Sequence, residues 1–159
     1  MANKKYMTKL NIGDKAPCFN GLDQNGNSIQ LTDFKGSKLI LYFYPKDNTP
    51  GCNAEACNLR DNYEMWLGKG YKVLGVSPDK QAAHQKFISK FDLPFSLISD
   101  TEKEIIKAYG AWGPKKLYGR EYEGLLRSTF VISEDGIVEQ IFTKVKTKDH
   151  TNQILEKIN

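Results

Sequence analysis

The sequence predicts an α/β protein in which helices flank a central mixed β-sheet. Residues 39–44 form a continuous apolar run with aromatic members, which is typical of a strand covered on both faces. Strand-like and helix-like segments alternate through the middle of the chain, and this alternation favours parallel strands. Two strand-like segments near the C-terminus, 128–132 and 137–142, are separated by a short turn and add an antiparallel hairpin.

The length of 159 residues predicts a single domain spanning 1–159, with residues 1–12 as a loose N-terminal arm. A chain of this size buries enough surface to fold without a disulfide or a metal. Its 23 basic and 19 acidic residues are dispersed and give a net charge of +4, and no basic helix carries interleaved aromatic residues. We therefore expect no nucleic acid among its partners.

The N-terminal residues lack the apolar core of a secretory signal, and no apolar run approaches the length of a membrane span. These absences predict a cytoplasmic protein without a membrane partner. The three cysteines would be reduced there at rest, so any disulfide would be transient or catalytic. The two histidines, His84 and His150, are far from each other and from the cysteines, and we expect no bound metal.

In chain order, the first expected elements are a hairpin and a helical turn. Short apolar stretches at 17–22 and 28–31 flank Asn25-Gly26, a dipeptide typical of hairpin turns. Residues 32–36 have the pattern of one helical turn closed by a glycine. The strand at 39–44 follows.

A loop with two prolines follows that strand, and a helix follows the loop. Pro50 suits the first turn of this helix, where a missing N–H is harmless. From Cys52 onward, apolar residues recur with the helical period and form one buried face. Its members are Ala56, Leu59, Tyr63 and Trp66. We expect one unbroken helix that ends at Gly68 or Gly70.

The remaining elements are predicted from the same signals of period, caps and turns. They are a strand at 71–76, a helix at about 79–91 capped by Ser77, a strand at 95–98, a helix through Tyr109 opened by a capping box of Thr101 and Glu104, a loop at 110–125, the hairpin of 128–142, and a last helix capped by Thr147. The loop at 110–125 is rich in Gly, Lys and Tyr, and we expect it to be an irregular surface loop with a short extended piece.

Cys52 is the candidate for chemistry, because it falls in the first turn of a helix that follows a buried strand. Free N–H groups and the positive end of the helix dipole favour an anion at this position, and thiolate is the reactive form of cysteine. Position alone leaves open the alternative that Cys52 is a small buried hydrophobic residue. The preceding Thr49-Pro50-Gly51 and a second cysteine, Cys57, favour the reactive role.

The pattern Pro45-x-x-x-Thr49-x-x-Cys52 resembles the active-site motif of the peroxiredoxins. The longer string YFYPKDNTPGCNAEACNLRDNY is similar to the bacterioferritin comigratory protein (thiol peroxidase Q) branch, which has a second cysteine five residues after the first. The resemblance covers nearly the whole chain. It implies a thioredoxin-like fold with an N-terminal β-hairpin.

The resemblance also implies the activity and the partners. Cys52 would be the peroxidatic residue that reduces hydrogen peroxide and organic hydroperoxides and becomes a sulfenic acid. Cys57 would be the resolving residue, and thioredoxin or a similar dithiol would reduce the resulting Cys52–Cys57 disulfide. This role belongs to antioxidant defence and redox homeostasis, needs no bound cofactor, and is expected of a monomer.

Fixed donors around the sulfur complete the expected site. The residues that would bind the peroxide are Thr49, Gly51, Cys52 and Arg127, and Pro45 would shield the thiolate from water. Arg127 is included because it occupies the position of the family's active-site arginine at the start of a strand. Glu55 either braces Arg127 or is a first-turn acid that favours the helix dipole. Cys18 has no counterpart in this mechanism, and we expect it to be structural.

Two other functions are open to the same cysteine pair. Thioredoxin-like dithiol oxidoreductases act on protein disulfides, but they carry Cys-x-x-Cys on this helix and this chain does not. A non-enzymatic redox-sensing or holding protein is compatible with the sequence. Consumption of hydrogen peroxide by the reduced protein distinguishes the three.

Overall fold

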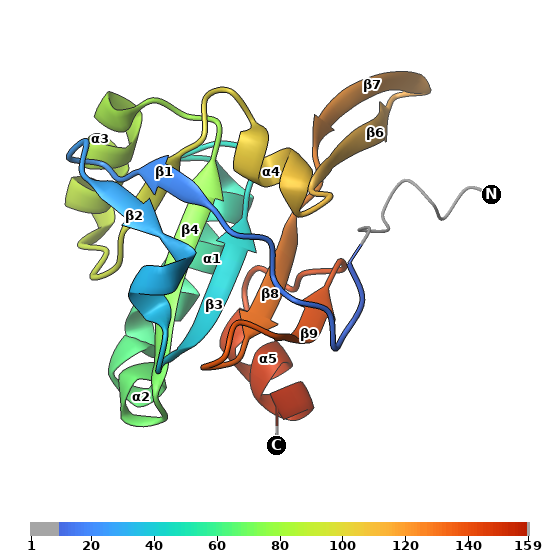
Figure 1. Ribbon diagram of the computed structural model, residues 1–159. Coiled ribbons are helices and arrows are strands. Elements are labelled where there is room, and N and C mark those ends of the chain that lie inside the picture. The colour runs from blue at the N-terminus through green and yellow to red at the C-terminus, as the bar shows by residue number, and fades with distance from the viewer. Residues whose placement is uncertain (1–9, 159) are drawn as a thin grey trace.

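The computed structural model describes residues 10–158, which fold into a seven-stranded mixed sheet with helices on both faces and a separate two-stranded hairpin (Figure 1). The strands are β1 Asn20–Leu22, β2 Ser28–Gln30, β3 Lys38–Phe43, β4 Tyr71–Ser77, β5 Leu97–Ser99, β6 Trp112–Leu117, β7 Arg120–Leu125, β8 Ser128–Ile132 and β9 Val138–Phe142. The helices are α1 Pro50–Asp61, α2 Tyr63–Gly68, α3 Gln81–Phe91, α4 Glu104–Ala108 and α5 His150–Ile158, with a 3₁₀ turn at Leu31–Phe34.

The large sheet has the order β2-β1-β5-β4-β3-β8-β9. Strands β3, β4 and β5 are parallel, whereas β8 runs antiparallel to β3 and pairs with β9 as a hairpin. At the other edge, β1 and β2 form the N-terminal hairpin and β1 pairs antiparallel to β5. The predicted α/β class, the mixed sheet and both hairpins are confirmed.

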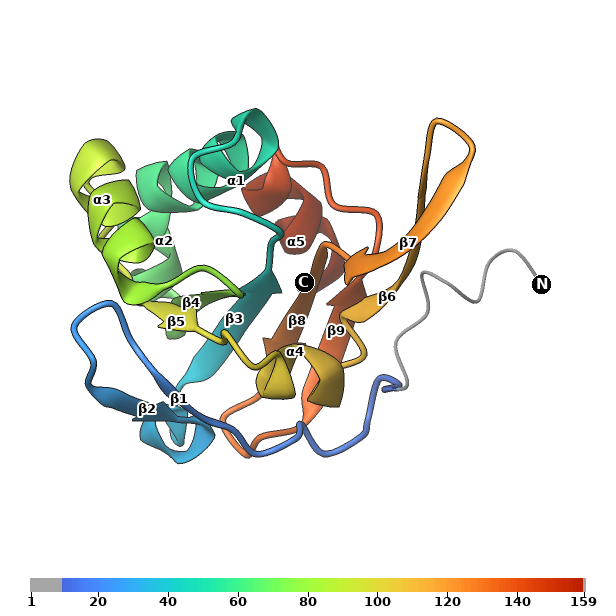
Figure 2. The same ribbon diagram turned by 90° about the horizontal axis from the view of Figure 1, so that it is seen from above.

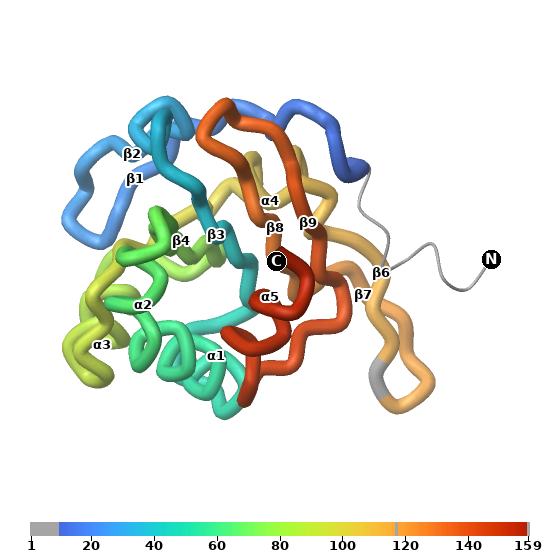
Figure 3. The backbone as a smooth tube through the Cα atoms, turned by 90° about the horizontal axis from the view of Figure 1, so that it is seen from below, coloured from blue at the N-terminus to red at the C-terminus, as the bar shows by residue number. Residues whose placement is uncertain are grey.

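The central strand β3 separates two hydrophobic cores. Leu41 and Phe43 point into the core that α4 covers, and Ile40 and Tyr42 point into the core beneath α1, α2, α3 and α5. Figure 2 shows α4 alone on its face of the sheet and the other four helices on the opposite face, where α1 and α5 lie side by side (Figure 3). Burial on both faces explains why this strand is a continuous apolar run.

The expected single helix from Cys52 is divided in two at Asn62, which was not predicted. Asn62 has φ −110 and ψ 12, ends α1 and begins α2. Its side-chain amide donates to the Asn58 carbonyl at 2.8 Å and so satisfies one backbone acceptor near the end of α1. The buried face continues across the break to Trp66, so the apolar period alone could not reveal it.

The irregular loop expected at 110–125 is instead the hairpin of β6 and β7, which projects from the body of the protein (Figures 1 and 2). Tyr118 (φ 51) and Gly119 (φ 78) form a two-residue turn in which both residues have positive φ. Such turns usually carry Asn-Gly or Asp-Gly, and most of β7 is exposed. The usual turn dipeptide and an apolar alternation were therefore both missing from the sequence.

Two of the three predicted helix caps do not form, because the residues before α3 and α4 make no side-chain cap hydrogen bond. Ser77 lies inside β4 and does not cap α3, which begins at Gln81; the Ser77 hydroxyl instead donates to Asp79 at 2.7 Å. The capping box of Thr101 is also wrong, because the carboxylate of Asp100 accepts the N–H of Ile106 at 2.7 Å.

The third cap comes from a helix that is distant in sequence. Helix α5 begins at His150, so Thr147 does not cap it. The Asn58 side chain on α1 accepts the N–H of Thr151 at 2.7 Å and donates to the Lys148 carbonyl at 3.3 Å. This contact ties α1 to the start of α5.

The N-terminal arm expected at 1–12 lies outside the described residues up to residue 9. Leu10 packs against the core, and Gly13 donates its N–H to the Val138 carbonyl at 2.8 Å, so the described end of this segment is attached. Between residues 10 and 158, none of the helices is both long enough and apolar enough to cross a bilayer.

Candidate active site

The register of the strands brings two parts of the chain that are far apart in sequence to the same end of the sheet. Phe43, the last residue of β3, pairs with Ser128, the first residue of β8. The loop that follows β3 and the residue that precedes β8 therefore meet at the same end of the sheet. Cys52 lies in the first turn of α1 after that loop, and Arg127 lies immediately before β8.

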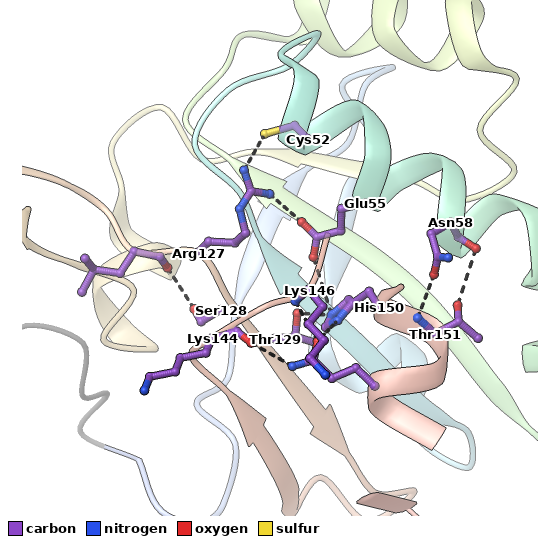
Figure 4. Close-up of polar contacts among 12 residues, drawn as sticks. Cys52, Glu55, Asn58, Arg127, Ser128, Thr129, Lys144, Lys146, His150 and Thr151 are labelled. Atoms are coloured by element: carbon purple, nitrogen blue, oxygen red, sulfur yellow. Dashed lines mark hydrogen bonds and ion pairs between the residues drawn. The ribbon is translucent and has the colours of Figure 1, made fainter. Parts of the chain in front are cut away.

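Cys52, Arg127 and Glu55 form a connected row (Figure 4). Arg127 Nη2 donates to Cys52 Sγ at 3.2 Å, and Arg127 Nη1 donates to Glu55 Oε1 at 2.6 Å. The thiol is only 1% exposed, whereas the guanidinium is half-buried and reaches it from the side of the solvent. A fixed cation and the start of a helix thus both face the sulfur, and both favour negative charge there.

Glu55 braces Arg127, which decides between the two roles predicted for it. It lies three residues after Cys52 on the same helical face and is fully buried. Burial raises the pKa of Glu55 from 4.5 to about 7, although Arg127 acts in the opposite direction. Its second oxygen, Oε2, has no hydrogen bond from the described residues and lies 3.6 Å from His150 Nε2.

His150 is a neutral neighbour of Glu55 that sequence reasoning did not place in the site. Gln153 Oε1 accepts the Lys146 N–H, so the imidazole Nδ1 donates to the same oxygen at 2.9 Å. Nε2 is then an acceptor for the Thr129 hydroxyl at 2.8 Å. Burial lowers the pKa of His150 to about 4, which keeps the ring neutral.

We expect Glu55 to make stability depend on pH. Because the pKa of Glu55 is raised to about 7 in the folded protein, Glu55 adds to the free energy of unfolding. This added stability is full below pH 4.5 and is lost as the pH rises through about 7. The difference in free energy of unfolding between wild type and Glu55→Gln should therefore fall between about pH 5 and about pH 8. Denaturant unfolding at both pH values measures it.

The exposed Glu64→Gln is the matched control, because it makes the same substitution on the surface and away from the Arg127 site. His150 has the opposite trend, since its contribution is lost as the pH falls through about 4. That trend is common to all three proteins and cancels in the comparison. A Glu55→Gln difference that is constant with pH would contradict the expectation.

The other predicted site residues lie around this row with different contacts. Thr49 precedes α1 as its N-cap residue, and its hydroxyl donates to the Lys46 carbonyl at 2.9 Å rather than to the sulfur. Pro45 is half-buried. A Cβ added to Gly51 would lie 3.2 Å from Arg127 Nη2, so the glycine gives the guanidinium room to approach.

The three cysteines are all free thiols, and they differ in position. Cys57 is half-buried on α1 with Cys52. Cys18 is exposed and lines a cavity of about 270 Å³ with Leu39 and Ile132, which are at the opposite ends of β3 and β8 from the site. Its exposure contradicts the structural role that we expected.

Lys115 is a further cation that sequence reasoning missed, because it lies on the unpredicted hairpin. It is half-buried on β6, and its stem crosses Gly124, where an added Cβ would lie 2.9 Å from Lys115 Cδ. Burial lowers the pKa of Lys115, as does the charge of Arg127, while Cys52 acts in the opposite direction. The hairpin thus brings a second positive charge toward the Arg127 site.

Asp47, Asp79 and His84 form a second polar cluster, and their ligand-type atoms lie within 4.8 Å of one another. His84 Nδ1 is 2.6 Å from Asp47 Oδ2, and Asp79 Oδ2 accepts both the Asp47 N–H and the Ser77 hydroxyl. The oxygen and nitrogen atoms that could bind a metal are already engaged in these hydrogen bonds. A metal would have to displace them.

Comparison with known proteins gives consistent matches along the chain. The AhpC/TSA family pattern matches residues 12–141. Peroxiredoxin Bcp of Bacillus subtilis is 43% identical over 149 residues, covering 94% of this chain and 95% of that protein. A peroxiredoxin Q variant from Xylella fastidiosa has a TM-score of 0.89 at 30% identity, covering 96% and 97% of the two chains. The bacterioferritin comigratory protein of Xanthomonas campestris, described with alkyl peroxide reduction activity, has a TM-score of 0.82 at 33% identity and coverage of 87% and 88%.

Proposed function

This chain belongs to the AhpC/TSA family and is a peroxiredoxin, a peroxidase that acts on peroxides and is reduced again by a thiol; from this we propose that Cys52 is its peroxidatic residue. The observation that carries the proposal is the 3.2 Å hydrogen bond from Arg127 Nη2 to Cys52 Sγ at the start of α1. Among the cysteines of residues 10–158, Cys52 is the one whose sulfur accepts a side-chain hydrogen bond, and Cys18 lies at the far end of the sheet.

The first step is attack of the Cys52 thiolate on the terminal oxygen of the peroxide. The S–O bond forms as the O–O bond breaks, the sulfur becomes a sulfenic acid, and water or an alcohol leaves with a proton. Negative charge spreads over the sulfur and both oxygens in the transition state. Arg127 and the N–H groups at the start of α1 stabilise it, with Thr49 and Gly51 lining the approach and Pro45 limiting access of water.

The second step joins Cys52 and Cys57. The Cys57 thiol displaces water from the sulfenic acid and forms an intramolecular disulfide, which thioredoxin or a similar dithiol then reduces by exchange. The alkyl peroxide reduction described for the Xanthomonas campestris relative supports organic hydroperoxides as substrates beside hydrogen peroxide. We expect the protein to act as a monomer.

The disulfide requires the first turns of α1 to unwind. Both cysteines lie within α1, and five helical residues separate their Cα atoms by about 8–9 Å with a turn of about 140°. A disulfide needs Cα atoms roughly 4.4–6.8 Å apart. We therefore expect the oxidised protein to show faster amide exchange at residues 49–58 than the reduced protein, while the sheet is unchanged.

Hydrogen exchange with mass spectrometry measures this difference, and Cys57→Ser treated with the same peroxide is its control. That variant cannot form the bond, so its helix should keep the slow exchange of the reduced state. A crystal structure with Cys52 bonded to Cys57 and the hydrogen bonds of α1 intact would show the expectation to be wrong.

Stopped-flow mixing of the reduced protein with hydrogen peroxide tests the assignment as a whole. A peroxidase consumes many equivalents of peroxide when a dithiol reductant is present. A redox sensor consumes about one equivalent and stops, and a dithiol oxidoreductase reduces a protein disulfide faster than it consumes peroxide. The last two results would each overturn the proposal.

A further inference from the structure

Behind the loop that presents Cys52 lies a buried hydrogen-bond network that the proposed mechanism does not use. Its centre is the carboxylate of Asp47, a side chain that is only 5% exposed. Tyr44 donates to Asp47 Oδ1 at 2.6 Å, and His84 Nδ1 lies 2.6 Å from Asp47 Oδ2. The side chains of Tyr44 and His84 are fully buried. Helix α3 therefore holds the loop through His84.

The hydrogen bonds determine where the protons of this network are. His84 Nε2 lies 3.0 Å from the Ile98 carbonyl oxygen, which can only accept, so Nε2 carries a hydrogen. A contact of 2.6 Å between Nδ1 and a carboxylate oxygen requires one more proton between them. The pair thus shares one proton. It is a strong hydrogen bond between buried groups, and the loss of either partner leaves the other without a hydrogen-bond partner.

The loop is fixed at further points on either side of this bond. The Asp47 N–H donates to Asp79 Oδ2 at 2.8 Å. Asn48 has a positive φ of 58, and its side-chain oxygen accepts Lys90 Nζ from α3 at 3.1 Å. Asparagine adopts this conformation more readily than most residues, and the contact with Lys90 ties it to α3. The chain is therefore docked on α3 up to Asn48, four residues before Cys52.

We propose that His84 is a positioning residue of the peroxidase: its Nδ1 bond to Asp47 fixes the loop 45–49 and so places Cys52 for attack on the peroxide. The same bond sets the N-terminal limit of the segment that unwinds for the disulfide. His84 does not contact the reacting atoms and acts through the backbone. The inference rests on the proposed role of Cys52, and its test includes a readout that does not.

Two substitutions of His84 separate the effects of the two hydrogen bonds that its imidazole ring makes. The amide nitrogen of His84→Asn takes the place of Nδ1, so this variant keeps the donor to Asp47 and loses the one to Ile98. His84→Gln places its amide nitrogen near Nε2, so it keeps the Ile98 bond and loses the Asp47 bond. Each variant loses one buried hydrogen bond, and both should melt at a lower temperature than wild type.

We expect stopped-flow oxidation of Cys52 by hydrogen peroxide to be about ten- to a hundred-fold slower in His84→Gln, because small misplacements have effects of this order. His84→Asn should retain most of the wild-type rate constant. Asp47→Ala, which removes the same bond from the loop side, should be as slow as His84→Gln. It also supplies the test where the buried glutamine does not fold.

Amide exchange of residues 45–49 in the reduced proteins is the second readout, and it does not require any reaction with peroxide. Exchange should be at least about tenfold faster in His84→Gln and Asp47→Ala than in wild type and His84→Asn. Equal rate constants in wild type and His84→Gln, or equal slowing in both His84 variants, would overturn the proposal. Wild-type protein that does not react with peroxide would instead refute the proposed function, and exchange would still decide whether His84 docks the loop.

Discussion

Replacing Cys52 by serine is expected to abolish peroxide reduction, because this substitution removes the proposed nucleophile. A serine hydroxyl is not ionised near neutral pH, whereas the thiolate is the nucleophile. Arg127 and the start of α1 then face a neutral oxygen, so the charge stabilisation that they provide has no anion to act on. Peroxide consumption in the presence of a dithiol reductant measures the loss.

Cys18→Ser is the matched control, because Cys18 is exposed at the far end of β3 and should not affect turnover. Cys57→Ser separates the two steps: one equivalent of peroxide should be consumed rapidly, and recycling by the dithiol reductant should fail. Substantial turnover by Cys52→Ser would remove the assignment of this residue as the nucleophile.

Arg127→Ala is expected to slow the first oxidation step by about ten- to a thousand-fold, which corresponds to about 1.4–4 kcal/mol of lost charge stabilisation. The substitution removes the donor to Cys52 Sγ and, with it, the partner of the buried Glu55 carboxylate. Because Arg127 opposes the raised pKa of Glu55, its loss should also favour the protonated form of that carboxyl. Single-turnover oxidation followed by intrinsic fluorescence gives the rate constant.

Arg127→Lys distinguishes charge from geometry. A lysine keeps the positive charge, but its single ammonium group cannot reproduce the planar fork that spans Cys52 Sγ and Glu55 Oε1. We expect a rate constant between those of wild type and Arg127→Ala. If Arg127→Ala oxidises as fast as wild type, the hydrogen bond to Sγ has no part in the first step.

Local sequence patterns predicted the elements that form the centre of the candidate site. The apolar run of β3 is buried on both faces, Pro50 stands at the start of α1, and the position of Arg127 before β8 followed from a motif. Cys52 and Arg127 could be expected to meet only through the resemblance to the peroxiredoxins. The sheet register then explains that meeting, since it pairs the end of β3 with the start of β8.

The features that could not be predicted depend on partners distant in sequence. Asn58, on the neighbouring helix α1 but 93 positions away in sequence, accepts the N–H of Thr151 at the start of α5, and no pattern near Thr147 indicates this. His84 and Asp47 are separated by 37 positions, and neither lies in a recognisable motif for a buried pair. His150 approaches Glu55 only because α5 packs beside α1. The turn of Tyr118 and Gly119 has the dihedral angles of a hairpin without its usual residues.

The division of the predicted helix at Asn62 limits how far a redox cycle can disturb the protein. Asn58 is bonded to α5, Arg60 donates to the Phe91 carbonyl at 2.7 Å, and α2 begins anew beyond Asn62 with Trp66 fully buried. Melting that starts at the first turn of α1 therefore meets a fixed boundary after about two turns. Such a small cooperative unit opens far more often than the whole domain. Repeated catalytic cycles can then proceed while the buried residues beyond this boundary, among them Leu59 and Trp66, stay packed.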